Sequence, residues 1–291
     1  MSPPLARALT AALGQPVVQL TPVAGGDLND AYAATLGDGA RVFVKTSADP
    51  AAAGSFVAEA DGLRWLAEAD ALPVPDVLAV ADEGSSAVRF LALRWIDAGT
   101  PTQRSEEALG RGLAALHAAG APAFGGPAAT LRIGPLTLPN EPAEDWPSFY
   151  ATRRLEPLAR LAHDRRALPA DAPALLDRLT ARLPQLAGPP EPPARVHGDL
   201  WSGNVLTDTR GMPWLIDPAA HGGHRELDLA MLRLFGGPSE RCFQAYEEVA
   251  PLKPGAHERV GLWQLTPLLL HAALFGLAWG QRATAVLRRY A

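Results

Sequence analysis

The sequence predicts an α+β protein of two lobes, with residues 1–95 forming a small antiparallel sheet and residues 96–291 forming a larger, mainly helical lobe. Short apolar runs bounded by turn residues fill the first part, whereas apolar residues at helical spacing dominate the second. The chain has 291 residues, of which 48 % are hydrophobic, which is enough to bury a core in each lobe. A cleft between two such lobes is a preferred place for an active site.

The elements expected in the first lobe follow from local patterns. Leu5, Leu9 and Leu13 recur at helical spacing, which predicts a short helix over residues 3–13. A second helix is expected over residues 55–69, with Phe56, Leu63 and Leu66 on its inward face. A Gly37-Asp38-Gly39 turn joins the second and third of five expected strands. These strands cover residues 17–23, 31–36, 41–46, 77–80 and 87–93.

The second lobe begins after a short connection over residues 95–100. Ser105 is expected to cap its first helix, because Glu106 and Glu107 follow in the first turn. Residues 119–145 are rich in Gly and Pro and are expected to run over the surface without regular structure. Residues 188–193 form a proline-rich break, and residues 195–217 hold a loop and a short hairpin. Helices are expected over residues 105–118, 147–162, 171–187 and 226–290.

Composition narrows the classes of function. The net charge of −5 argues against a nucleic-acid partner, which usually requires a basic surface. Cys242 is the only cysteine, so one chain can form neither a disulfide nor a cysteine-based zinc site. Residues 1–20 lack the basic start and apolar run of a signal peptide, so the cytoplasm is the expected location.

Residues 260–280 carry no formal charge, and by length alone they could span a membrane. Gln264, Thr266, Pro267 and His271 interrupt this stretch, and no second stretch of this kind exists. We therefore expect a buried core helix here rather than a membrane span.

Lys45 stands out against an arginine-rich background. The chain has 26 Lys+Arg, of which only Lys45 and Lys253 are lysines. Lys45 lies in an apolar strand, and Glu59 follows fourteen residues later in the next helix. A strand lysine held by a helix glutamate can direct its ammonium group at the α- and β-phosphates of ATP. The alternative is a surface ion pair, which is common and contributes little.

The segment from Val196 to Leu206 carries the strongest chemical signal. It reads Val-His-Gly-Asp-Leu-Trp-Ser-Gly-Asn-Val-Leu, with Asp199 and Asn204 five positions apart, as in the catalytic loop of kinases. In that arrangement Asp199 accepts a proton from the attacking hydroxyl group, and Asn204 binds Mg²⁺. Asp217 follows thirteen residues after Asn204 and offers a second oxygen ligand for the metal. The alternative is a solvated turn, in which the Asp and Asn side chains only cap backbone groups.

Weaker signals suggest further contacts. Gly25 and Gly26 lie between the first two strands, where their backbone N–H groups could cover a phosphate, although an ordinary turn fits nearly as well. Trp201 could stack on the acceptor, or could pack its loop against the large lobe. His224 and Arg225 could contact the acceptor, or could form structural pairs with Glu226 and Asp228.

These residues resemble the fructosamine kinase (ketosamine kinase) family, within the wider aminoglycoside-phosphotransferase and protein-kinase-like group. The His197–Asn204 run, with its Trp201, is similar to the catalytic loop of that family. The resemblance extends from Gly25 to about Gly276. Further similar segments are Leu215-Ile216-Asp217-Pro218-Ala219, Gly223-His224-Arg225-Glu226, Asp228-Leu229-Ala230-Met231, Leu234-Phe235-Gly236-Gly237, Ile133-Gly134, Asp145-Trp146 and Arg154-Leu155.

The resemblance implies a bilobal protein-kinase-like fold, with ATP and Mg²⁺ as cofactors. By it, the backbone around Arg94, Trp95 and Ile96 meets the adenine, and the enzyme phosphorylates the 3-hydroxyl of a ketosamine. That phosphorylation destabilises the adduct and releases the amine, which is deglycation. Residues 268–273 read Leu-Leu-Leu-His-Ala-Ala, which departs from the polar and aromatic residues expected there. If this region shapes the acceptor pocket, we expect the substrate to differ from the family's.

Two other functions remain open at this point. One is a kinase that acts on another small hydroxyl acceptor, such as an aminoglycoside, because a fold does not fix the substrate. The other is a nucleotide-binding module without catalysis. A monomer is expected, and its ketosamine partner could be a free small molecule or an adduct on a protein.

Overall fold

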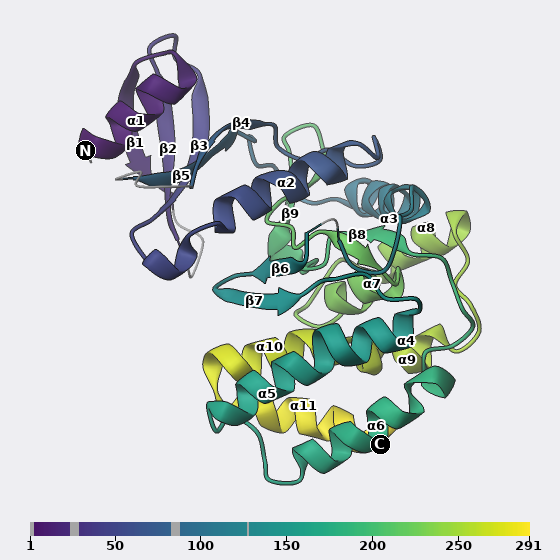
Figure 1. Ribbon diagram of the computed structural model, residues 1–291. Coiled ribbons are helices and arrows are strands. Elements are labelled where there is room, and N and C mark those ends of the chain that lie inside the picture. Colours follow the sequence, from purple (N-terminus) through teal and green to yellow (C-terminus); the bar gives the residue numbers. More distant parts are fainter. Residues whose placement is uncertain (1–2, 24–28, 83–87, 127) are drawn as a thin grey trace.

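The computed structural model describes residues 3–23, 29–82, 88–126 and 128–291, and it has the expected small sheet lobe and larger helical lobe (Figure 1). The small lobe contains a five-stranded antiparallel sheet with the strand order β1-β2-β3-β5-β4. The strands are β1 (Val17–Pro22), β2 (Asp30–Leu36), β3 (Arg41–Ser47), β4 (Val77–Ala81) and β5 (Arg89–Arg94).

Strand alternation gives this sheet two apolar faces. Val42 and Val44 of β3 pack in one buried cluster with Leu5 and Leu9 of helix α1 (Pro3–Leu13). The alternate residue Phe43 packs against the opposite cluster, which contains Phe56 of helix α2 (Ser55–Ala67). Because side chains alternate along a strand, Lys45 lies on the same face as Phe43 and points toward α2.

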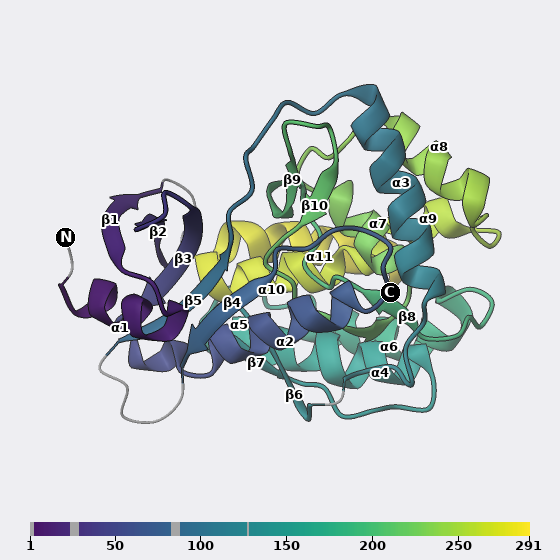
Figure 2. The ribbon, with the colours of Figure 1, turned by 90° about the horizontal axis from the view of Figure 1, so that it is seen from above.

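The large lobe is built mainly from helices (Figures 1 and 2), which bury a large apolar cluster around α5, α10 and α11 and a second one between α3 and α8. Helix α3 packs along α8, and α10 packs against both α5 and α11. A π-helical segment, Tyr150–Leu155, joins α4 to α5. The helices are α3 (Gln103–Ala118), α4 (Trp146–Phe149), α5 (Glu156–Asp164), α6 (Ala172–Leu186), α7 (Glu226–Leu232), α8 (Glu240–Val249), α9 (Ala256–Trp263), α10 (Leu265–Phe275) and α11 (Leu277–Tyr290).

Three small antiparallel pairs complete this lobe. Strand β6 (Thr130–Ile133) pairs with β7 (Leu136–Pro139), and this hairpin reaches helix α2 of the small lobe. Strand β8 (Ala194–Val196) pairs with β11 (His221–Gly223). Strand β9 (Val205–Thr207) pairs with β10 (Pro213–Leu215).

Two local expectations were wrong. Residues 119–145 are not irregular throughout, because the β6–β7 hairpin buries Leu131 and Leu138. Ser105 is not the cap of α3. The Thr102 hydroxyl accepts the Ser105 backbone N–H at 3.2 Å, and Ser105 Oγ accepts the Thr102 N–H at 2.6 Å. This reciprocal capping box places the N-cap three residues earlier, at Thr102.

The uncharged stretch over residues 260–280 is divided between three helices. Helix α9 ends at Trp263, α10 ends at Phe275, and Gly276 between α10 and α11 adopts φ 94° and ψ −161°, a conformation open essentially only to glycine. Leu265, Leu268 and Leu269 of α10 are buried in the large core. Among the described residues, no helix combines the length and the apolar character that a membrane crossing requires.

Candidate active site

Strand pairing in the large lobe brings Asp199, Asn204 and Asp217 together. The loop that follows β8 carries Asp199, and a single 3-10 turn, Ser202–Asn204, leads into β9. The Ala219 N–H donates to the His197 carbonyl at 2.9 Å, and the Ile216 N–H donates to the Asn204 carbonyl at 3.0 Å. These two bonds tie the segment around Asp217 directly to the catalytic loop.

Gly198 is required by the closeness of this contact. Its φ is 82°, and a Cβ atom at this position would lie 2.1 Å from the Ala219 carbonyl oxygen. A side chain here would force the two segments apart and move Asp199 away from Asp217.

Lys45 connects the two lobes at this site. Its Nζ donates to Glu59 Oε1 at 2.8 Å and to Asp217 Oδ1 at 2.5 Å. Burial alone would lower the pKa of Lys45, but the carboxylates of Glu59 and Asp217 together raise it well above its ordinary value. The expected Lys45–Glu59 pair is therefore present and largely buried, and Asp217 of the other lobe extends it.

Asp199 lies beside Asn204 in a half-buried position. Asn204 Nδ2 donates to the Asp199 backbone carbonyl at 2.8 Å and to its Oδ2 at 3.3 Å. Burial raises the pKa of Asp199 to about 7, and the nearby Asp217 carboxylate adds to this rise. A carboxylate with a raised pKa is better suited to accept a proton from a hydroxyl group.

The oxygen atoms at this site fit a hard cation that also binds phosphate. Asp217 has a φ of 55°, in the left-handed region that few non-glycine residues adopt, and its side chain is 42 % exposed. Within the described ranges no three His, Cys, Asp or Glu side chains cluster as a metal site. A cation here would thus be held by the Asp217 carboxylate and the Asn204 amide oxygen, with phosphate oxygens completing its shell, as is usual for Mg²⁺.

A pocket opens next to Asp199 on the side of the large lobe. Asp199 and Thr266 are the polar side chains of its lining, and α7 and α10 contribute the apolar Met231 and Leu270. Trp201 lies two residues beyond Asp199, is 41 % exposed, and meets the ring of Phe235 edge to face at 6.4 Å.

Trp95 lies where the chain leaves β5 for the large lobe. Its indole stacks under the Arg41 guanidinium at 4.6 Å, and its Nε1 donates to Asp97 at 3.1 Å. Ile96 follows and is half-buried. Gly25 and Gly26 lie outside the described residues.

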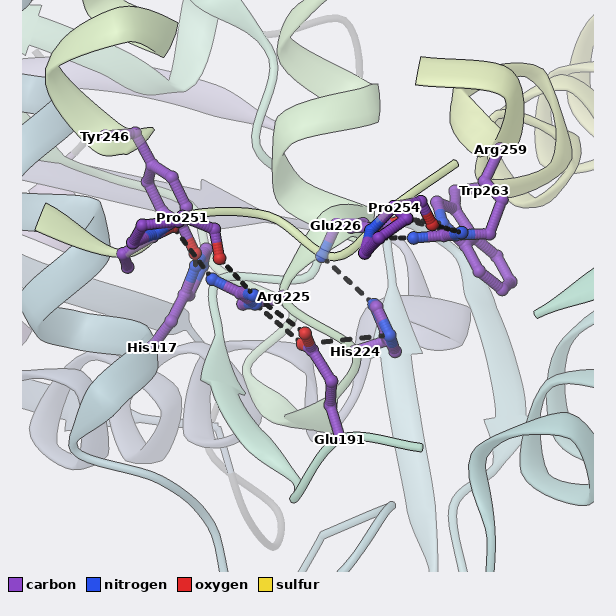
Figure 3. Close-up of polar contacts among 11 residues, drawn as sticks. His117, Glu191, His224, Arg225, Glu226, Tyr246, Pro251, Pro254, Arg259 and Trp263 are labelled. Carbon is purple, nitrogen blue, oxygen red and sulfur yellow. Dashed lines mark hydrogen bonds and ion pairs between the residues drawn. The ribbon is translucent and has the colours of Figure 1, made fainter. Parts of the chain in front are cut away.

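His224 and Arg225 contact other parts of the large lobe (Figure 3). Neither residue lines the pocket beside Asp199. Arg225 donates to both oxygens of Glu191, at 2.6 and 2.7 Å, and to the Ala250 and Pro251 carbonyls. His224 is buried and stacks on Trp263 at 5.4 Å. The partner of Arg225 is thus Glu191 rather than Asp228.

Asp228 of α7 supports the catalytic loop from behind. Its fully buried carboxylate accepts the His197 N–H at 2.7 Å and the Gly198 N–H at 2.9 Å. His117 Nε2 of α3 lies 3.3 Å from the same carboxylate, and its Nδ1 lies 2.9 Å from the Tyr246 hydroxyl. Because a carboxylate only accepts, Nε2 carries the proton, and His117 is a positioning residue that acts through Asp228.

The start of α7 is held by two further ion pairs (Figure 3). Glu226 accepts from Arg259 at 2.5 and 2.9 Å and from Trp263 Nε1 at 2.7 Å. Glu191, from the proline-rich break, holds Arg225.

The sequence analysis did not identify His117, Tyr246 or Glu191. The only signals were a lone histidine on an apolar helix face and a lone acid among prolines, and both patterns are common in cores and loops.

The fold and these groups define a phosphotransferase of the protein-kinase-like class. A search of solved structures supports the fold. An aminoglycoside phosphotransferase superposes with a TM-score of 0.65 at 21 % identity, with both chains fully covered. A crystal structure from Thermobifida fusca, described as a fructosamine-3-kinase, has a TM-score of 0.89 and 44 % identity, with 98 % of this chain and 97 % of that chain covered.

The sequence comparisons identify the family. Residues 1–291 match the fructosamine kinase family. A probable ketoamine kinase of Synechocystis is 36 % identical over 98 % of this chain and 95 % of its own length. A probable ketoamine kinase of Thermus thermophilus is 35 % identical over 88 % of this chain and 87 % of its own length. The chain therefore belongs to the fructosamine kinase family, and the predicted resemblance is confirmed.

Replacing His117 with Leu tests its positioning role. We expect kcat to fall about tenfold, because Asp228 loses a hydrogen bond that orients the loop carrying Asp199, while the KM for nucleotide stays nearly unchanged. Tyr246→Phe, which leaves the contact between His117 and Asp228 in place, should have a smaller effect. Steady-state kinetics on folded protein distinguish a positioning role from a purely structural one. If the role of His117 is purely structural, its replacement should lower stability and leave kcat intact.

Replacing Glu191 with Gln tests whether its ion pair with Arg225 anchors the start of α7, through the pH dependence of the protein's stability. Burial opposes ionisation, but the Arg225 hydrogen bonds outweigh it and hold the pKa of Glu191 below its ordinary value of 4.5. The stabilisation is therefore complete above that value and is lost as the pH falls toward the folded-state pKa. Thermal melts should show Glu191→Gln less stable than wild type at pH 7, with the gap narrowing on acidification. Glu144→Gln, at an exposed carboxylate, is the control, and an equal gap at pH 7 and pH 3 would contradict the anchor.

Proposed function

We propose that this protein is an ATP- and Mg²⁺-dependent kinase that phosphorylates the 3-hydroxyl group of a ketosamine, a sugar–amine adduct. The observation that supports it most is the convergence of Lys45 from one lobe with Asp217 and Asp199 from the other. Relatives named as ketoamine kinases and a fructosamine-3-kinase support the choice of acceptor and of hydroxyl group.

In this proposal Asp199 orients the acceptor hydroxyl and takes its proton as the oxygen attacks the γ-phosphorus. The bond from that phosphorus to the bridging oxygen breaks, and ADP leaves with the electron pair. The raised pKa of Asp199 suits this role at neutral pH.

Asn204 and Asp217 would hold the metal ion. When bound with the nucleotide, Mg²⁺ supplies positive charge that neutralises the transferred phosphoryl group. Lys45, held by Glu59, would place its ammonium group against the α- and β-phosphates. The backbone around Trp95 and Ile96 is proposed to meet the adenine, and the backbone of Gly25 and Gly26 to approach the phosphates.

Among the expected substrate contacts, Trp201 is retained as a proposed stacking surface, because its ring is exposed and close in sequence to Asp199. His224 and Arg225 are proposed instead as supports of α7, because their contacts lie within the protein. We propose that the 3-phosphate destabilises the adduct so that the amine is released, and that the enzyme works as a cytoplasmic monomer.

A second candidate is a kinase for another small hydroxyl acceptor. The similarity of the fold to that of an aminoglycoside phosphotransferase supports this candidate, because the same phosphate-transfer groups can serve different acceptors. A nucleotide-binding module without catalysis is a third candidate, which the grouping of Lys45, Asp199, Asn204 and Asp217 disfavours.

The test is an ATP-to-ADP assay with Mg²⁺ on a ribulosamine, a fructosamine and kanamycin. We expect turnover on a ketosamine, and a loss of about a thousandfold in Asp199→Asn, because the base is removed while its shape is kept. Asp61→Asn, at an exposed carboxylate of α2, is the matched control. Turnover only on kanamycin would transfer the proposal to the second candidate, and ATP binding without any turnover would favour the third.

A further inference from the structure

A group of aromatic side chains extends from the catalytic loop across the surface of the large lobe. The ring of Phe235 lies 6.4 Å from Trp201, 5.0 Å from His271 and 5.8 Å from Trp279. His271 lies 4.6 Å from Trp279 and 5.4 Å from Phe275. We call these residues the aromatic platform: Trp201, Phe235, His271, Phe275 and Trp279.

The aromatic platform adjoins the pocket that contains Asp199. Pro267 and Leu270 of α10 line that pocket, and His271, the next residue, lies with its Nδ1 2.7 Å from the Pro267 carbonyl oxygen. Trp201 belongs to the catalytic loop, two residues beyond Asp199. Trp201 is 41 % exposed, so a molecule whose hydroxyl group reaches Asp199 finds open ring surface close to it in the catalytic loop. Phe275, one turn beyond His271 on α10, is 55 % exposed.

Arg282 of α11 lies at the far side of the platform. Its guanidinium carbon is 4.5 Å from the ring centroid of Trp279. Burial lowers the pKa of His271, and the positive charge of Arg282 lowers it further. Arg282 therefore contributes positive electrostatic potential at the aromatic platform. Across the described part of the chain, the guanidinium group of Arg282 has no ion pair or hydrogen bond with another residue, whereas that of Arg288, on the same helix, pairs with Asp171 at 2.8 Å.

The chemistry of this surface selects a particular kind of acceptor. Aromatic faces attract the cationic nitrogen of an amine adduct and also cover its apolar substituent. A guanidinium group that is stacked on a ring keeps its N–H donors free at the edge, in the fork that matches a carboxylate. The fixed ring contact also reduces the side-chain entropy that Arg282 would lose on binding.

We propose that the aromatic platform binds the nitrogen substituent of the ketosamine and that Arg282 binds a carboxylate on that substituent. The preferred acceptor is then a free glycated amino acid, because an adduct within a protein chain has an amide in place of the carboxylate. This inference rests on the proposed function and names its substrate class.

The test compares two ketosamines that share one sugar, the ribulose adducts of phenylalanine and of phenethylamine, which differ only in the carboxylate. In the wild-type enzyme we expect the KM for the phenylalanine adduct to be about fivefold lower, as for an exposed ion pair, at similar kcat. Arg282→Gln should remove this difference and leave the KM for ATP unchanged. Arg289→Gln is the matched control, because Arg289 also lies over a ring, that of Tyr290 at 5.4 Å, at the end of the same helix.

A second variant tests the platform itself. Trp279→Leu should raise the KM for both adducts, because both share the phenyl group and the amine. Equal KM values for the two adducts in wild type, or equal effects of Arg282→Gln and Arg289→Gln, would overturn the inference while leaving a ketosamine kinase intact. If wild-type enzyme turns over neither adduct but phosphorylates kanamycin, the proposed function fails and this inference falls with it.

Discussion

The ion pair between Lys45 and Asp217 is the interaction on which the site depends, because it joins residues 172 positions apart on two lobes. An ammonium group in a largely buried position is costly unless carboxylates surround it, and here Glu59 and Asp217 both do. Because Asp217 is 42 % exposed and either carboxylate remains when the other is removed, losing one partner should cost less than the roughly 3–5 kcal/mol of a fully buried pair. Strand alternation in β3 directs Lys45 to this position, and the packing of Phe56 against the sheet sets the place of α2 and hence of Glu59.

The large lobe fixes its half of the site through hydrogen bonds to backbone rather than through apolar packing alone. Asp228 holds two N–H groups of the catalytic loop, and α7 is held in turn by the pairs of Glu191 with Arg225 and of Glu226 with Arg259. These contacts explain why a helix with no proposed role in the reaction carries two buried carboxylates, Glu226 and Asp228. They also explain the proline-rich break, which positions Glu191 without the conformational freedom of an ordinary loop.

Some of this could be predicted from the sequence because the signal is local. The catalytic loop lies within eight residues, His197–Asn204, and the alternation of β3 identifies Lys45 as unusual in its strand. Other features depend on partners far away in the chain. The role of His117 can be recognised only from its contacts with Asp228 and Tyr246, which lie 111 and 129 residues away in the chain. The β6–β7 hairpin was missed because its Gly- and Pro-rich flanks hide four-residue strands.

The most direct measurement of the central claim is calorimetric binding of ATP with and without Mg²⁺ to the wild type, Asp217→Asn and Glu59→Gln. If Asp217 holds the metal and Lys45 the phosphates, Asp217→Asn should lose most of the increase in ATP affinity that Mg²⁺ produces in the wild type. Glu59→Gln should weaken binding under both conditions and keep the metal effect. Full Mg²⁺-dependent tightening in Asp217→Asn would contradict the account, because the residue that joins the lobes would then have no part in binding the metal.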